Sequence, residues 1–152
     1  MCLNNLRDLL VEELNALHSV SVQALAVLPQ MAQAATALEV RRIIQNYADD
    51  KRAQVADVEQ ALQKLGAAPS DKKCPSVEGL IEEATEMIRA TGDPEVLDTG
   101  LTLRVMRLQQ HTLTINDAVV CTYNKILAAQ ENERLDEDVN QKAFFIKSKT
   151  VH

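Results

Sequence analysis

The sequence predicts an all-α protein, a bundle of four long helices with a short crossover helix between the second and the third. The 152 residues include only four Gly and four Pro, and they are rich in Ala, Leu, Gln and Glu, which lose little side-chain freedom in a helix. Apolar residues recur with helical spacing along each long segment, and no segment has the pattern of a strand. The length predicts one domain over residues 1–152, with residues 146–152 as a frayed tail.

The first helix is predicted over residues 4–35, because its apolar residues form a seam with heptad spacing. One row has a residue at every seventh position and consists of Leu10, Leu17, Ala24 and Met31. A second row lies four positions further along and consists of Leu14, Ser21 and Leu28. Ser21 is the one polar member of this seam. Pro29 is expected to kink the helix or to end it early.

The second helix is predicted to begin at the stretch TALE, residues 36–39. Thr36 and Glu39 have the spacing of a capping box, in which both side chains bind free N–H groups of the first turn. Ile44, Val58 and Leu65 mark its apolar stripe. Gly66 is expected to end the helix in the left-handed conformation, and residues 66–75 are predicted to form a loop.

A short amphipathic helix is predicted over residues 76–92. Gly92 would end it, Asp93 would cap the next helix, and Pro94 would occupy the first helical position. A third long helix is expected to reach about Ala129, and a last helix to begin at Asn132. Two helix pairs joined by a crossover are the connectivity of a ferritin-like bundle.

Composition excludes several classes of function. The net charge of −6 is unsuited to binding nucleic acid, which needs a basic surface. No apolar run reaches the length of a membrane span, and the N-terminus lacks a signal-peptide pattern. The three cysteines, Cys2, Cys74 and Cys121, are odd in number and scattered, which indicates reduced thiols and a cytoplasmic location.

Polar residues interrupt the apolar stripes near the middle of each long helix, at the level where bundles build metal sites. They are Ser21, then Asp50, Lys51 and Gln54, then Gln110 and His111, and last Asp138 and Lys142. A di-metal site needs several carboxylates and a histidine one turn from a glutamate, but the chain has no Glu-x-x-His. The two lysines could instead neutralise the two aspartates. His111 is expected to bind a neighbouring helix through a hydrogen bond.

Several stretches, in this order, resemble the YciE/YciF-type ferritin-like stress-protein family: LRDLLVEEL, LPQMAQAAT, KKCPSVEGLIEEATEMI, GDPEVLDTGL and QHTL. The resemblance covers about residues 3–145, and KCPSVEGLIEEA is its most specific part. It implies a dimeric four-helix bundle with a metal site and a role in stress. Carried onto this chain, the family's ligand positions fall on Ser21, Asp50, Gln54, Gln110, His111, Leu113, Asp138 and Lys142.

These positions retain few of the expected carboxylates, so the resemblance implies a ferritin-like protein that has lost its di-metal site. We therefore expect a non-catalytic structural or interaction protein with no cofactor. The alternative is a weak or mononuclear site at Asp50, His111 and Asp138 that binds Fe, Mn or Zn, with oxidase or storage activity. Leu103, Met106, Leu113 and Val120 indicate a second apolar face on the third long helix, which favours a homodimer. Cys121 is expected to pack in the core.

Overall fold

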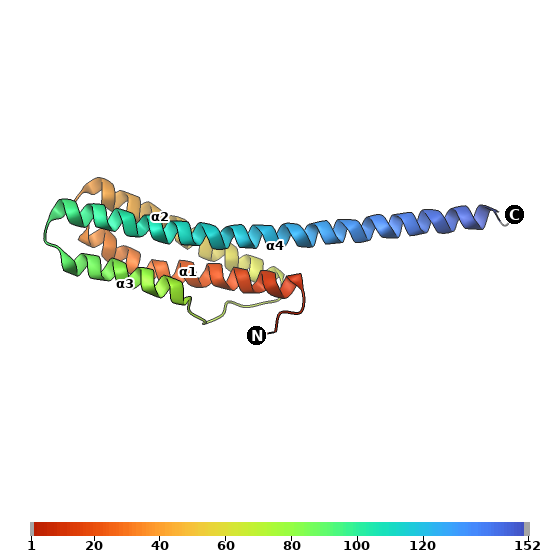
Figure 1. Ribbon diagram of the computed structural model, residues 1–152, viewed down its shortest axis with the longest axis horizontal. Helices are drawn as coiled ribbons and strands as arrows, with labels where there is room; N and C mark the ends of the chain where they lie inside the picture. The colour runs from red at the N-terminus through yellow and green to blue at the C-terminus, as the bar shows by residue number, and fades with distance from the viewer. Residues whose placement is uncertain (1, 151–152) are drawn as a thin grey trace.

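The computed structural model describes the backbone of residues 2–150 and the side chains of residues 2–135 and 137. This part of the chain forms four helices and no strand (Figure 1). The helices are α1 (Leu6–Ala34), α2 (Leu38–Lys64), α3 (Pro75–Ala90) and α4 (Pro94–Thr150). The predicted all-α bundle and its short helix between the second and third long helices are confirmed. Within residues 2–150, no helix has both the length and the apolar character needed to cross a membrane.

The helix α1 matches the predicted seam. All seven members of the seam, from Leu10 to Met31, are buried, including Ser21. Asn5 caps the helix, because its Oδ1 atom accepts a hydrogen bond of 2.9 Å from the N–H group of Asp8. Pro29 does not end α1 early, since the helix continues to Ala34.

The capping box predicted for α2 is wrong. The N-cap residue is Ala37, and its side chain makes no capping bond. Asp98 of α4 provides the cap instead, because its carboxylate accepts from the N–H groups of Thr36 and Ala37 at 2.8 and 2.7 Å, and from Thr36 Oγ1 at 2.6 Å. A side chain from another helix therefore satisfies the donors that a local glutamate was expected to satisfy.

Gly66 and Asp93 lie where the sequence predicts them. Gly66 follows α2 with a φ of 69°, the left-handed conformation that glycine adopts without strain. Asp93 caps α4 through a 2.9 Å bond from the N–H group of Val96, and Pro94 occupies the first position. The prediction that Gly92 ends the short helix is wrong, because α3 ends at Ala90 and Thr91 is its C-cap residue.

The predicted break between the third and fourth long helices, at Asn132, is wrong. The helix α4 is continuous over 57 residues and extends well beyond the rest of the bundle (Figure 1). Its sequence contains no Gly or Pro after Gly100, so nothing local ends the hydrogen-bonded ladder. A cap residue such as Asn132 begins a helix only where the preceding chain has already left the helical conformation.

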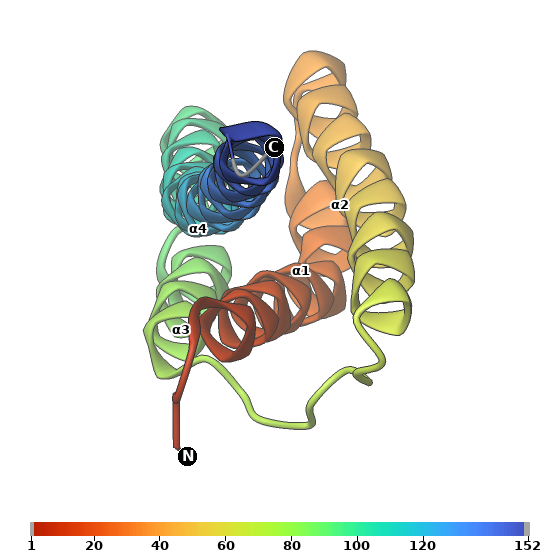
Figure 2. The ribbon, with the colours of Figure 1, turned by 90° about the vertical axis from the view of Figure 1, so that its right-hand side faces the viewer.

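The core consists of two clusters of buried apolar side chains stacked along the bundle. The larger cluster joins all four helices and includes Leu28, Met31, Ile44, Val77 and Leu101. The smaller cluster lies towards the start of α1 and the end of α2, and its buried members are Leu10, Leu14, Leu17, Val58 and Leu62. Viewed end-on, α3 and α1 lie beneath α4, and α2 lies on the far side of α1 (Figure 2).

Candidate functional site

A polar layer lies between the two apolar clusters. It consists of Ser21 on α1, Tyr47, Lys51 and Gln54 on α2, and Thr112 on α4. Along α1, Ser21 lies between Leu17 of the smaller cluster and Ala24 of the larger cluster. Lys51 and Gln54 are placed in the same way on α2, between Ala48 and Val58. The predicted interruption of the apolar seams at mid-bundle is therefore present.

Gln54 is the acceptor at the centre of this layer. Its Oε1 atom accepts from Lys51 Nζ at 2.6 Å and from Ser21 Oγ at 2.9 Å. Ser21 is fully buried, and its hydroxyl also lies 2.8 Å from the carbonyl oxygen of Leu17. The expected proximity of Ser21 and Gln54 is thus observed, and each side chain satisfies part of the other's hydrogen-bonding capacity.

Lys51 is the buried cation of the layer, with only 6 % of the residue exposed. Burial lowers the pKa of its amine to about 8, although the nearby Asp50 carboxylate acts in the opposite direction. The Nζ atom also lies 5.0 Å from the centre of the Tyr47 ring, within the range of a cation–π interaction. The bond to Gln54 and the aromatic face thus replace some of the hydration that Lys51 loses.

Tyr47 and Thr112 close the layer on the side of α4. Thr112 Oγ1 donates to the carbonyl oxygen of Leu108 at 2.8 Å, so the Tyr47 hydroxyl, 3.4 Å away, donates to Thr112. Burial raises the pKa of Tyr47, the bond to Thr112 opposes this rise, and the charge of Asp50 adds to it. Tyr47 and Thr112 have helical spacing with the apolar residues of α2 and α4, so periodicity alone assigns them to the apolar stripes. Both residues carry a hydroxyl group at the level of Ser21 along the bundle, and this feature of the sequence could have identified them as members of the polar layer.

The other predicted site residues lie elsewhere. Asp50 and Gln110 are exposed, and Leu113 is 48 % exposed. Lys51 could have neutralised Asp50, but its hydrogen-bond partner is Gln54. A further histidine, His18 on α1, was not among these predicted residues and forms a 3.0 Å pair with Glu59. The side chains of Asp138 and Lys142 lie outside the described residues.

His111 points towards α3 and not into the polar layer. Its Nε2 atom lies 3.0 Å from Ser76 Oγ and 3.9 Å from Cys74 Sγ. This confirms the expected hydrogen bond to a neighbouring helix. It also separates His111 from Gln54 and Ser21, because α3 and α2 contact different sides of α4 (Figure 2).

The cysteines are all free thiols. Cys2 is exposed and Cys74 is half-buried. Cys121 is exposed, so the expectation that it packs in the core is wrong. Cys121 lies on a different side of α4 from the buried residues, which include Leu108, Thr112 and Thr122.

A cavity of about 570 Å³ lies outside this layer, between the first half of α1 and the loop that follows α2. Its lining includes Val11, Leu65, Lys72 and Cys74, but none of the polar-layer residues. The candidate site is therefore a filled layer of the core and not an open pocket. Among the described side chains, no three His, Cys, Asp or Glu residues lie close enough together to hold a metal ion.

Fold and site define an all-α bundle with a hydrogen-bonded polar layer in its core. The family model described as "Domain of unknown function (DUF892)" matches residues 5–142, and the chain belongs to this family. Its relative Protein YciF of Escherichia coli (strain K12) is 23 % identical over 114 residues, which cover 74 % of this chain and 69 % of YciF. This confirms the resemblance to YciF-type proteins.

Two solved structures share the fold. One is YcfI of Rhodopseudomonas palustris, with a TM-score of 0.76, 24 % identity, and coverage of 81 % of this chain and 78 % of that one. The other is the Escherichia coli stress protein YciF, with a TM-score of 0.76, 20 % identity, and coverage of 82 % and 79 %.

Proposed function

We propose that this protein is a non-catalytic, stress-associated structural or interaction bundle. In this proposal, the position of the family's di-metal site is held by neutral hydrogen-bonding groups and one lysine. The observation that carries the proposal is the 2.6 Å bond from Lys51 Nζ to Gln54 Oε1 in the buried polar layer. The name of the relative YciF, a stress protein, supports the association with stress.

The chemistry of the donors supports this proposal. The layer offers hydroxyl groups, one amide oxygen and an ammonium group. Divalent cations such as iron, manganese and zinc bind best where carboxylates, imidazoles or thiolates supply negative charge or strong donors. The layer has no carboxylate among its five members, and the charge of Lys51 repels a cation. These residues do not fit a di-metal centre.

The alternative metal site at Asp50, His111 and Asp138 has less support. Asp50 is exposed on α2, and His111 binds Ser76 on the α3 side of α4. A shared ion would require both side chains to leave these positions.

We also propose that the protein is a cytoplasmic homodimer that has a further protein partner. Free thiols at all three cysteines support the cytoplasmic location. Support for the homodimer comes from exposed large apolar residues on α4, including Met106 at 57 % and Val120 at 49 %.

Metal content tests the loss of the site. The protein is expressed with supplements of Fe, Mn and Zn, purified without a metal-affinity tag, and measured by elemental mass spectrometry. We expect far less than one metal ion per chain, unchanged in Asp50→Ala and Asp138→Ala variants, and no coloured ferric species after aerobic addition of Fe(II). Near-stoichiometric metal that falls in these variants would overturn the proposal and favour the metalloprotein.

A further inference from the structure

Four exposed apolar side chains form a row along α4. Met106, Leu113, Val120 and Leu127 follow each other at intervals of seven residues and are 57, 48, 49 and 44 % exposed. Residues seven apart differ by only about 20° around a straight helix, so the row stays on one side of α4. Single exposed apolar residues are common, but a continuous row of them is typical of an interaction surface.

The row lies on the side of α4 that faces away from the bundle. The inward side carries the buried residues Leu101, Val105 and Leu108. In the end-on view, α1 and α3 lie on one side of α4, and no element of the chain lies on the opposite side (Figure 2). Nothing in the described part of one chain therefore covers the row.

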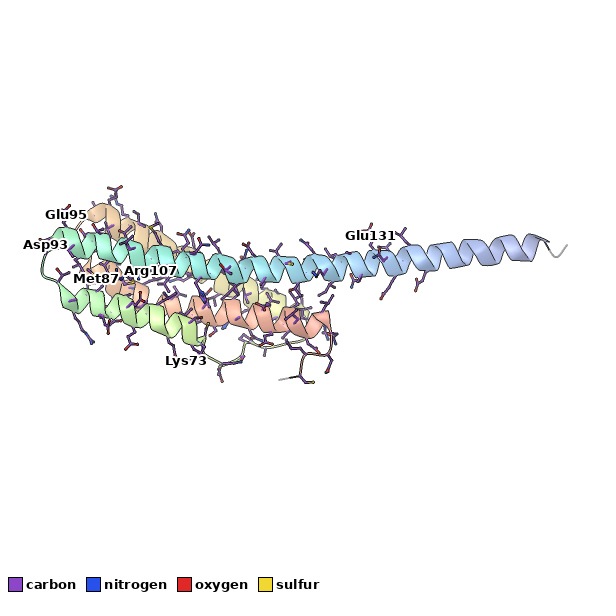
Figure 3. All side chains as sticks on the ribbon, in the orientation of Figure 1. Lys73, Met87, Asp93, Glu95, Arg107 and Glu131 are labelled. Atoms are coloured by element: carbon purple, nitrogen blue, oxygen red, sulfur yellow. The ribbon has the colours of Figure 1, made fainter. Side chains whose placement is uncertain are left out.

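The projecting half of α4 also lacks neighbours. The whole helix is about 85 Å long and α1 is about 44 Å long, at about 1.5 Å per residue. Every described side chain from Leu127 to Leu135 is exposed, and the labelled Glu131 lies beyond the end of the other helices (Figure 3). A helix without tertiary packing is only marginally stable in water, so contact with another chain would stabilise this half of α4.

We infer that a second copy of this chain covers the row, with the two α4 helices packed antiparallel about a twofold axis near Asn116 and Asp117. This inference rests on the homodimer of the proposed function and names its interface. In this register Met106 faces Leu127 of the partner subunit, and Leu113 faces Val120 of the partner subunit. The row is thus complementary to itself, as a twofold interface requires.

Antiparallel packing gives both halves of each α4 a folded neighbour, whereas parallel packing would leave the two projecting halves in contact only with each other. The antiparallel arrangement lays each projecting half along the bundle-packed half of the other copy, while the two bundles stay on opposite outer sides. With the axis between residues 116 and 117, residues 94–139 overlap, which is about 70 Å of helix. A contact about 10 Å wide would bury about 700 Å² per subunit, close to the roughly 800 Å² of a stable interface.

The mass of the protein in solution tests this interface. We expect light scattering to give about twice the chain mass of 16.8 kDa. Leu113→Glu combined with Val120→Glu should give the monomer mass, because Glu at 113 would face Glu at 120 of the other subunit and four carboxylates would form two like-charged pairs across the interface. Val22→Glu is the matched control, since Val22 is 44 % exposed on α1, and it should leave the dimer intact. Far-UV circular dichroism confirms that each variant is folded.

The outcomes separate this interface from the proposed homodimer. A monomeric wild-type protein would overturn both. A wild-type dimer that survives the double substitution would leave the homodimer in place and overturn the α4 interface.

Disulfide cross-linking tests the direction of the helices. The three native cysteines are replaced by serine, and Met106→Cys and Leu127→Cys chains are then prepared separately and co-expressed. We expect a disulfide-linked dimer from the co-expressed pair and none from either chain alone. Efficient cross-linking of each chain with itself would indicate parallel helices and overturn the antiparallel arrangement.

Discussion

Lys51 Nζ lies 2.6 Å from Gln54 Oε1, and the same oxygen accepts a 2.9 Å bond from the buried Ser21 hydroxyl. One amide oxygen thus connects a lysine on α2 to the seam of α1. The arrangement keeps a cation inside the bundle without a carboxylate within bonding distance of it. Because the ammonium group has lost most of its hydration, burial of its charge costs free energy in the folded state.

Replacing Lys51 with methionine should therefore stabilise the protein. Methionine has similar length, needs no hydration, and leaves Gln54 bonded to Ser21. We expect the free energy of unfolding at pH 7 to rise by about 1–3 kcal/mol, measured by urea denaturation. The control is Lys64→Met, because Lys64 is exposed in the last turn of α2 and should have little effect. A loss of stability in Lys51→Met would mean that the hydrogen bond and the aromatic contact outweigh the desolvation of the charge.

Stability should depend on pH through Lys51. Its pKa falls from 10.5 in the unfolded chain to about 8 in the folded protein, which corresponds to about 3 kcal/mol. Below about pH 8 both states carry the proton and the penalty is complete. Between about pH 8 and 10.5 the unfolded state binds more protons, so the free energy of unfolding rises with pH.

The measurement is a series of denaturation curves from about pH 7 to 9.5 for the wild type and Lys51→Met. Above about pH 10 the raised pKa of Tyr47 reverses the trend, since the unfolded tyrosine ionises first. We expect a rise in the wild type that is absent in the variant. An equal slope in both proteins would show that another group causes it.

The cap that Asp98 provides for α2 should be worth a measurable part of the stability. Asp98→Ala leaves the N–H groups of Thr36 and Ala37 without their partner, and loss of an N-cap costs about 0.5–2 kcal/mol. Asp57→Ala, an exposed site in the interior of α2, is the control. An unchanged melting temperature in Asp98→Ala would mean that water satisfies these donors equally well.

The same carboxylate also sets a dependence on acid. The hydrogen bond from Thr36 holds the pKa of Asp98 below its ordinary value of 3.8. Its contribution is complete above pH 3.8 and is lost as the pH falls through the lower folded value. The difference between wild type and Asp98→Ala should therefore shrink at the acidic end of a melting series.

Gly100 should be coupled to Met87 across the contact between α3 and α4. A Cβ atom on Gly100 would lie 2.5 Å from Met87 Cε and 2.9 Å from Met87 Cγ, so the methionine would have to move. We expect Gly100→Ala to destabilise the protein by about 1 kcal/mol, since overpacking outweighs the gain in helix propensity. In a Met87→Ala background the same change should stabilise it. Equal effects in both backgrounds would show that Met87 adjusts freely.

Much of the fold follows from local pattern. The seam from Leu10 to Met31, the left-handed Gly66 and the Asp93–Pro94 start of α4 each depend on residues within a turn or two of one another. The burial of Ser21 and its proximity to Gln54 also followed, because both interrupt apolar stripes near the midpoints of adjacent helices. These features agree with the prediction because helix periodicity and capping are short-range effects.

Other features depended on contacts between distant residues. Asp98 caps α2 although 61 residues separate it from Ala37. His111 binds Ser76, 35 residues away, and not the polar layer. Which side of α4 faces α3 depends on how the packed helices rotate about their axes, and a periodic pattern restricts that rotation only to a broad apolar face.

The sequence by itself determined an all-α bundle, most of its helix ends, and a polar interruption of its core, because neighbouring residues along each helix fix these. The tertiary structure decided which polar residues meet. It brought Lys51 and Gln54 to Ser21, sent His111 to α3, and left one side of α4 exposed. The reason is that the rotation and axial offset of packed helices arise from all their contacts together, and no single helix contains that information.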